Sequence, residues 1–165
     1  MRSRYAFIAA MILTSVAFAA EPGVVIGYTN PDLAKGARLL LAGRNEEGVR
    51  LTLLGLEAAS GKREEELALS NLCAGYTNLG DFETALKFCD IALQRNDKLW
   101  RVHNSKAFIY IYTKQYDQAE RELLKGEAIN RDAHSMKIAR AMYLDATNPV
   151  LPEVEIDDRR QSAGK

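Results

Sequence analysis

The chain has 165 residues, of which 47% are hydrophobic and 27% are charged, values that suit a single soluble globular domain. Its 22 basic side chains balance 22 acidic ones, so no basic excess exists to bind the phosphates of a nucleic acid. Its two cysteines are too few for a disulfide framework, and their spacing is not that of a zinc site.

Residues 1–20 follow the three-part pattern of a secretory signal peptide. Two arginines precede an apolar stretch, and Ala17-Phe18-Ala19 supplies a small-x-small cleavage site. The alternative is an uncleaved membrane anchor, but the apolar run is shorter than the roughly 20 residues that a spanning helix requires. We therefore expect an exported protein, periplasmic or secreted, with no stable membrane span after cleavage.

The first helical segments follow a lead-in at residues 21–31, which holds two prolines and two glycines and is expected to be extended. Asn30 can cap a helix that Pro31 opens and that runs to residue 42. A turn at residues 43–45 and a second apolar stripe over residues 46–59 predict a helix pair.

Two longer segments, residues 66–99 and 100–133, share one pattern of apolar and aromatic residues. In each, a helical stripe ends at a turn and restarts on a second helix, which predicts two adjacent antiparallel helices. The shared residues, each 34 positions apart, are Tyr76 with Tyr110, Phe82 with Tyr116, and Ala85 with Ala119. A fixed 34-residue period is typical of a repeated helix–turn–helix unit.

This pattern resembles the tetratricopeptide repeat family over most of the chain after residue 29. The resemblance implies a right-handed α-solenoid of antiparallel helix pairs whose first helices line a concave groove. It also implies that the chain binds another polypeptide.

The resemblance divides residues 32–148 into about three repeats and a cap. A degenerate first repeat near residues 29–65 precedes the repeats at 66–99 and 100–133. Gly36, Gly43 and Gly48 fall 37 residues before Cys73, Gly80 and Ala85, so the loop at residues 60–62 is expected to hold a three-residue insertion. A helix over 134–146 would cap the stack, and residues 149–165 are expected to form a flexible tail.

We find no enzyme signature in the sequence. It has no glycine-rich phosphate loop and no recognisable nucleophile arrangement. His103 and His134 have no neighbouring ligands at metal spacing, so we expect structural roles for both, with neither a metal nor a cofactor.

The two cysteines are expected to face each other across the second helix pair. Cys73 and Cys89 lie at similar distances on either side of the turn at Gly80-Asp81. Two alternatives remain open: a disulfide formed after export, or two buried thiols that serve as small apolar fillers.

The apolar run at residues 107–112 is the strongest binding signal, because a helix that is apolar on every side must be covered on every side or leave an adhesive face. The repeat register implies a mainly apolar groove with polar edges that suits an extended or helical peptide. The predicted groove residues are Leu40, Leu41, Leu67, Ser70, Asn71, Ala74, Thr77, Asn78, Arg101, Asn104, Phe108, Ile111 and Tyr112. The alternative is that the lead-in or the tail folds back over them.

These observations predict a non-catalytic adaptor or assembly factor that presents its groove to a peptide segment of a cell-envelope protein. The second hypothesis is a permanent accessory subunit, either of a homo-oligomer or of an enzyme complex. The identity of the partner does not follow from the sequence.

Overall fold

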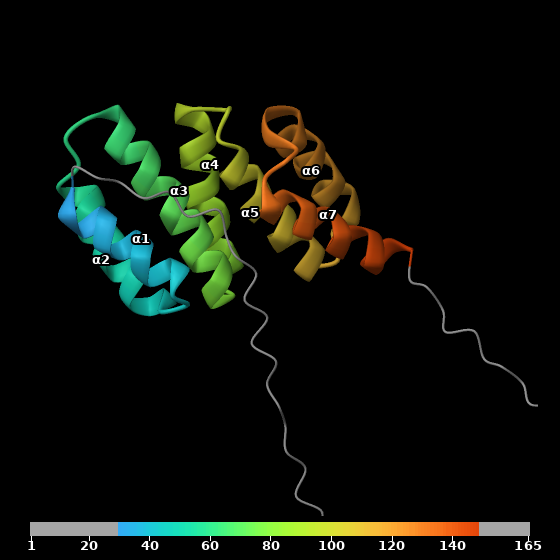
Figure 1. Cartoon of the computed structure of the whole chain (residues 1–165), viewed down its shortest axis with the longest axis horizontal. Helices are drawn as coiled ribbons and strands as arrows, with labels where there is room; N and C mark the ends of the chain where they lie inside the picture. The colour runs from blue at the N-terminus through green and yellow to red at the C-terminus, as the bar shows by residue number, and fades with distance from the viewer. Residues whose placement is uncertain (1–29, 149–165) are drawn as a thin grey trace, which may run out of the picture.

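The computed structural model describes residues 30–148, and within that range it contains seven α-helices and no strand (Figure 1). The all-α prediction is therefore confirmed. The helices are α1 (Pro31–Leu41), α2 (Asn45–Glu57), α3 (Lys62–Leu79), α4 (Phe82–Arg95), α5 (Trp100–Tyr112), α6 (Tyr116–Asn130) and α7 (His134–Thr147). The predicted signal peptide, most of the lead-in and the predicted tail lie outside the described residues.

Contacts between helices follow a regular scheme. Every helix packs against the next one in the chain, and α1, α3, α5 and α7 also form a row in which each touches the next. Among the described helices, no Cα atoms of α2, α4 and α6 come within 8 Å of one another. We call the continuous row of α1, α3, α5 and α7 the odd-helix row.

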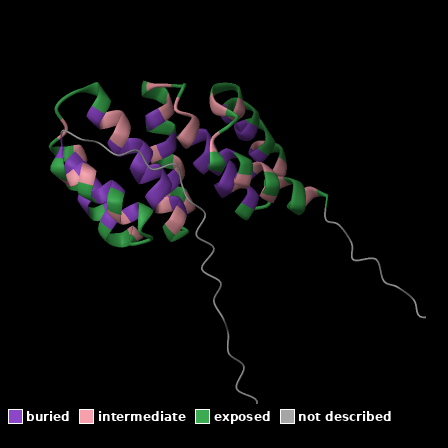
Figure 2. Cartoon of the chain, in the orientation of Figure 1, coloured by how far each residue is buried: buried purple, intermediate pink, exposed green. Residues whose placement is uncertain are grey.

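Three hydrophobic clusters lie between these helices, and each joins a helix pair to the first helix of the next. One cluster packs α1, α2 and α3, the second packs α3, α4 and α5, and the third packs α5, α6 and α7. Figure 2 shows buried residues along the central helices and exposed residues on the outer turns. Each pair therefore depends on its neighbour to cover its apolar side.

Close contact between α1 and α2 depends on glycine. A Cβ atom built on Gly36 would lie 2.6 Å from the Thr52 hydroxyl oxygen and 3.0 Å from the Gly48 carbonyl oxygen. A Cβ atom on Gly48 would in turn meet the Leu40 side chain at 2.7 Å. The first pair thus packs through glycines where the second pair, at the predicted equivalent positions, has Cys73 and Ala85.

In each pair, a residue with a left-handed backbone conformation lies within two positions of the end of the first helix. The φ angles are 74° at Gly43, 77° at Gly80 and 58° at Lys114. Lys114 lies 34 positions after Gly80, at the position that the predicted period assigns to it. The third turn therefore adopts the same left-handed conformation without a glycine, which normally costs about 1–2 kcal/mol.

Candidate partner-binding face

The predicted groove residues all come from α1, α3 and α5, but the structure exposes them unequally. Leu41 and Tyr112 are exposed to 51% and 44%, and Leu67, Asn78 and Arg101 are half-buried. The buried members are Leu40, Ser70, Asn71, Ala74, Thr77, Asn104, Phe108 and Ile111. Only five of the predicted groove residues are therefore accessible to a partner: Leu41, Leu67, Asn78, Arg101 and Tyr112.

Phe108 is a core residue rather than a surface anchor, which corrects one prediction. Its side chain is only 2% exposed and packs in one cluster with Leu123 of α6 and with Met136 and Ala139 of α7. The sequence did not show that α7 would reach α5 as well as α6. Ile111 is also buried, so little of the apolar run at residues 107–112 remains available to a partner.

Tyr112 remains accessible at the end of α5. Its ring stacks on Phe82 of α4 at a centroid distance of 5.9 Å and on Phe108 at 6.4 Å. Aromatic stacking of this kind holds a ring in place, and 44% of Tyr112 stays exposed. Tyr112 therefore presents a positioned aromatic surface.

Four buried polar atoms on the odd-helix row have no hydrogen-bond partner among the described residues. They are the hydroxyl oxygens of Ser70 and Ser105 and both side-chain amide atoms of Asn104. Ser70 of α3 and Asn104 of α5 are 34 positions apart, and α3 packs against α5. Each buried polar group left unpaired costs about 1–3 kcal/mol, so these side chains lower the stability of the fold.

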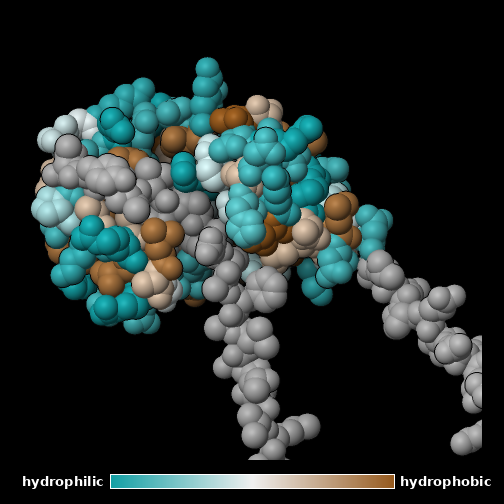
Figure 3. Space-filling model, in the orientation of Figure 1, coloured by the Kyte–Doolittle hydropathy of each residue, from teal (hydrophilic) through white to brown (hydrophobic). Residues whose placement is uncertain are grey.

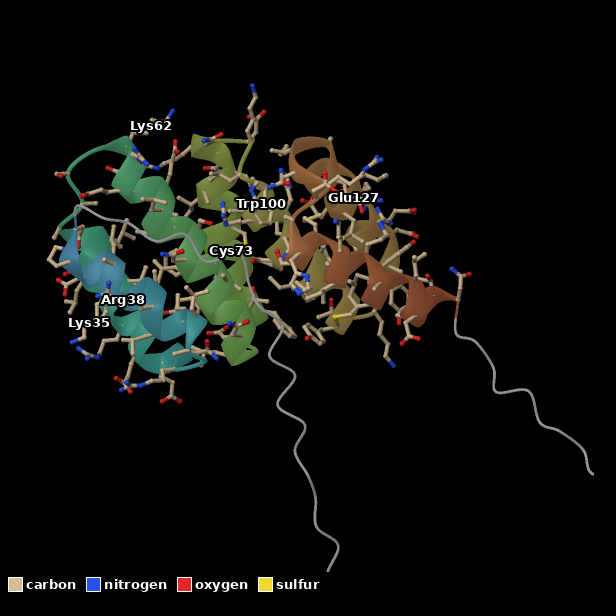
Figure 4. All side chains as sticks on the ribbon, viewed as in Figure 1. Lys35, Arg38, Lys62, Cys73, Trp100 and Glu127 are labelled. Atoms are coloured by element: carbon tan, nitrogen blue, oxygen red, sulfur yellow. A yellow bond between two sulfur atoms is a disulfide. The ribbon has the colours of Figure 1, made fainter. Side chains whose placement is uncertain are left out.

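Arg101 lies one helical turn before Asn104 and adds a positive charge. Its guanidinium carbon lies 4.4 Å from the centre of the Trp100 ring, a residue that Figure 4 shows near the centre of the fold. Burial lowers the pKa of Arg101, and within residues 30–148 no carboxylate lies at ion-pair distance from it. By contrast, Lys106 on the same helix pairs with Asp90 at 2.7 Å.

Cys73 and Cys89 form a disulfide between α3 and α4, with their Cα atoms 4.9 Å apart. Both residues are completely buried, in the cluster that joins α3, α4 and α5. Of the two alternatives that the sequence left open, the structure contains the disulfide.

A buried hydrogen bond joins α5 to α6, and sequence reasoning did not anticipate it. His103 Nδ1 lies 2.7 Å from a carboxylate oxygen of Glu122, whose other oxygen accepts from Lys125 at 3.0 Å. Burial raises the pKa of Glu122, but the hydrogen bonds from His103 and Lys125 outweigh burial and hold the pKa at about 2. One signal in the sequence could have predicted this contact. His103 and Glu122 lie 34 positions after Leu69 and Phe88, so two polar residues replace two apolar residues that belong to one hydrophobic cluster.

The described residues contain no group of three or more His, Cys, Asp or Glu side chains placed to hold a metal ion. None of the seven described helices combines the length and the apolar character needed to cross a membrane.

On the face drawn in Figure 3, the described surface is largely hydrophilic, with hydrophobic side chains in separate patches.

Comparison with protein-family models, with curated proteins and with solved structures gave no match for this chain. The class that the fold itself defines is an all-α protein of packed helix pairs.

Proposed function

We propose that this chain is a non-catalytic adaptor of the tetratricopeptide-repeat type that binds an extended peptide segment along its odd-helix row. Three repeats and a final capping helix would form a right-handed solenoid. The recurrence of a left-handed residue at Gly43, Gly80 and Lys114 supports this repeat scheme. A stack whose odd helices have backbones closer together than those of its even helices would curve toward the odd side, which supports a concave face there.

The accessible side chains of α5 carry the proposal. The Tyr112 ring is 44% exposed and stacks on Phe82 and Phe108, and the half-buried Arg101 has no carboxylate at ion-pair distance within residues 30–148. An extended peptide offers backbone and side-chain groups that this ring and this guanidinium could contact. Ser70, Asn104 and Ser105 add unpaired polar atoms to the same row, but these atoms are buried and out of reach of a peptide in this conformation.

Export to an oxidising compartment is part of the same proposal. The predicted signal peptide motivates it, and the Cys73–Cys89 disulfide supports it, because such bonds persist outside the reducing cytosol. The proposed partner is therefore a segment of another envelope or secreted protein.

The test begins with selection of peptides from a random ten-residue display library on the purified protein. Affinities of the selected peptides are then measured for wild type, for Tyr112→Ser and for Leu124→Ser. Leu124 is the matched control because it is a 56% exposed hydrophobic residue on α6, outside the odd-helix row.

We expect Tyr112→Ser to weaken binding at least tenfold and Leu124→Ser to leave it within twofold. Equal affinities for all three proteins would contradict the proposed face. A library that yields no binder, together with a stable oligomer in light scattering, would instead favour the accessory-subunit hypothesis.

A further inference from the structure

The middle of α3 is buried on every side. Residues 68–75 are eight consecutive buried positions, which span more than two helical turns and therefore include every face of the helix. The described helices next to α3 are α1 and α5, which flank it in the odd-helix row, and the even helices α2 and α4. Each described neighbour thus lies in the row or on its even side, yet the opposite side of α3 is covered as well.

Buried polar atoms lie in the same part of the row. Ser70, Asn104 and Ser105 are no more than 2% exposed, and their side chains hold polar atoms with no hydrogen-bond partner within residues 30–148. Most buried polar groups in folded proteins are paired, because an unpaired one costs about 1–3 kcal/mol. Both the cover and the missing partners therefore point to a segment outside residues 30–148.

The segment that precedes Asn30 is long enough to reach this region. Asn30 is fixed at the start of α1, because its side-chain amide donates to the Gly55 carbonyl oxygen at 2.9 Å and its side-chain oxygen caps the helix. Neighbouring helix axes lie about 8–10 Å apart, so α5, two positions along the row, is roughly 20 Å from α1. Residues 21–29 extend by about 3.3 Å each, or roughly 30 Å together.

Composition favours this segment over the one that follows α7. Residues 21–29 hold four apolar side chains, Val24, Val25, Ile26 and Tyr28, and one charged residue. Residues 149–165 carry seven charged side chains among 17 residues. Burial of a charge is costly unless the charge is paired, and the unpaired groups in the row are neutral hydroxyl and amide groups. The mainly apolar segment therefore suits the buried region better.

From these observations we propose that residues 21–29 lie extended across the odd-helix row of their own chain, over α3 and α5, and compete there with the partner peptide. Their backbone N–H and C=O groups supply the partners of Ser70, Asn104 and Ser105. The row thus has an occupant built into the chain. An outside peptide does not reach these three side chains, whereas Arg101 and Tyr112 stay accessible at the two ends of α5.

The competition rests on the proposed function, since it requires that the partner peptide binds the same row. A tethered segment acts at an effective concentration on the order of millimolar. An outside peptide that needs the middle of the row must therefore displace residues 21–29 first. Any change that detaches this segment should raise the affinity of the chain for its partner.

Paramagnetic broadening of backbone amide signals tests the position of the segment. Cys73 and Cys89 are disulfide-bonded, so a nitroxide label attaches only to the new thiol of Glu21→Cys in the purified, unreduced protein. We expect this label to weaken the signals of residues 102–105 in α5 more than those of α2. Glu155→Cys is the matched control, since the same label in the segment after α7 should leave the signals of residues 68–75 and 102–105 unchanged.

A second variant tests whether apolar contact holds the segment in place. Val25→Asp in the labelled protein should at least halve the broadening of residues 102–105, because it places a charge in the covered region. Val154→Asp, its control in the other segment, should leave that broadening unchanged. Val25→Asp should also raise the affinity for the library-selected peptides at least tenfold.

Two broadening results would overturn the proposed position: a Glu21→Cys label that weakens α5 no more than α2, or a Glu155→Cys label that weakens residues 68–75 and 102–105 more strongly. Loss of broadening in Val25→Asp without a gain in peptide affinity would overturn the competition. The broadening experiment uses no partner peptide. A peptide selection that fails would therefore contradict the proposed function while the position of residues 21–29 is still decided.

Discussion

Reduction of the Cys73–Cys89 disulfide should weaken the fold by an amount set mainly by the loop that it closes. The two residues are 16 positions apart, so the bond restricts a short loop in the unfolded chain. The loop-entropy relation gives about 3 kcal/mol for a loop of this length at 25 °C. That is a large share of the roughly 5–15 kcal/mol by which a domain is usually stable.

Urea unfolding followed by circular dichroism, with and without reductant, measures this difference. The oxidised protein should unfold at a higher urea concentration, and its free energy of unfolding should exceed that of the reduced protein by about 3 kcal/mol. The double variant Cys73→Ala/Cys89→Ala is the control, because reductant should not change its unfolding curve. Thiol titration of the unfolded, unreduced wild type should find almost no free cysteine.

The reasoning fails if reductant leaves the wild-type transition unchanged while thiol titration confirms that the bond has been broken. Such a result would mean that the α3–α4 turn already restricts the unfolded chain as strongly as the disulfide does. Two reactive thiols in the unreduced protein would contradict the disulfide itself.

Three further predictions concern the core, a turn and the Glu122 carboxylate. Phe108→Ala should lower the free energy of unfolding by about 3–5 kcal/mol in urea denaturation, because it leaves a cavity in the cluster of α5, α6 and α7; a loss below about 1 kcal/mol would indicate a surface ring. Lys114→Gly should raise stability by about 0.5–1 kcal/mol, since relief of the left-handed backbone exceeds the entropy cost of a new glycine; no gain in melting temperature would contradict this. Glu122 has its pKa lowered from 4.5 to about 2, so its stabilising contribution is present above pH 4.5 and is lost as pH falls toward 2. Glu122→Gln should therefore show a smaller decline of stability over that pH interval than wild type does, and equal declines would count against the ion pair.

Local patterns were sufficient to predict most helix boundaries. The segment predicted at residues 100–133 and the helix predicted over 134–146 begin at Trp100 and His134, where the structure begins α5 and α7. These signals are local, because a turn residue acts on its own backbone and a stripe on its own helix. The first helix of the second pair is longer than its apolar stripe, since α3 begins at Lys62 with a first turn that holds the acidic residues Glu64 and Glu65.

The candidate site was predicted less well, because burial depends on partners that are distant in sequence. Phe108 and Ile111 are buried by packing that the helical register alone does not reveal. The bond between His103 and Glu122 joins residues 19 positions apart on two helices, so no local pattern pairs them. Comparison of equivalent positions would have shown the exchange, since the second pair has Leu69 and Phe88 there.

The same limit applies to the buried polar atoms of the odd-helix row. Ser70 and Asn104 were expected in the groove from their register, but the sequence could not show that their polar atoms would be buried without a partner. A periodic pattern specifies which face of a helix a residue occupies. It does not specify which hydrogen bonds the assembled fold leaves unmade.

The most direct measurement of the proposed binding face is hydrogen exchange of the backbone amides with and without a saturating selected peptide. The account predicts that added protection is confined to α1, α3 and α5 and is largest around Asn104 and Tyr112, with α2, α4 and α6 unchanged. Protection concentrated on α2, α4 and α6, or a peptide that binds tightly without protecting α3 and α5, would contradict it.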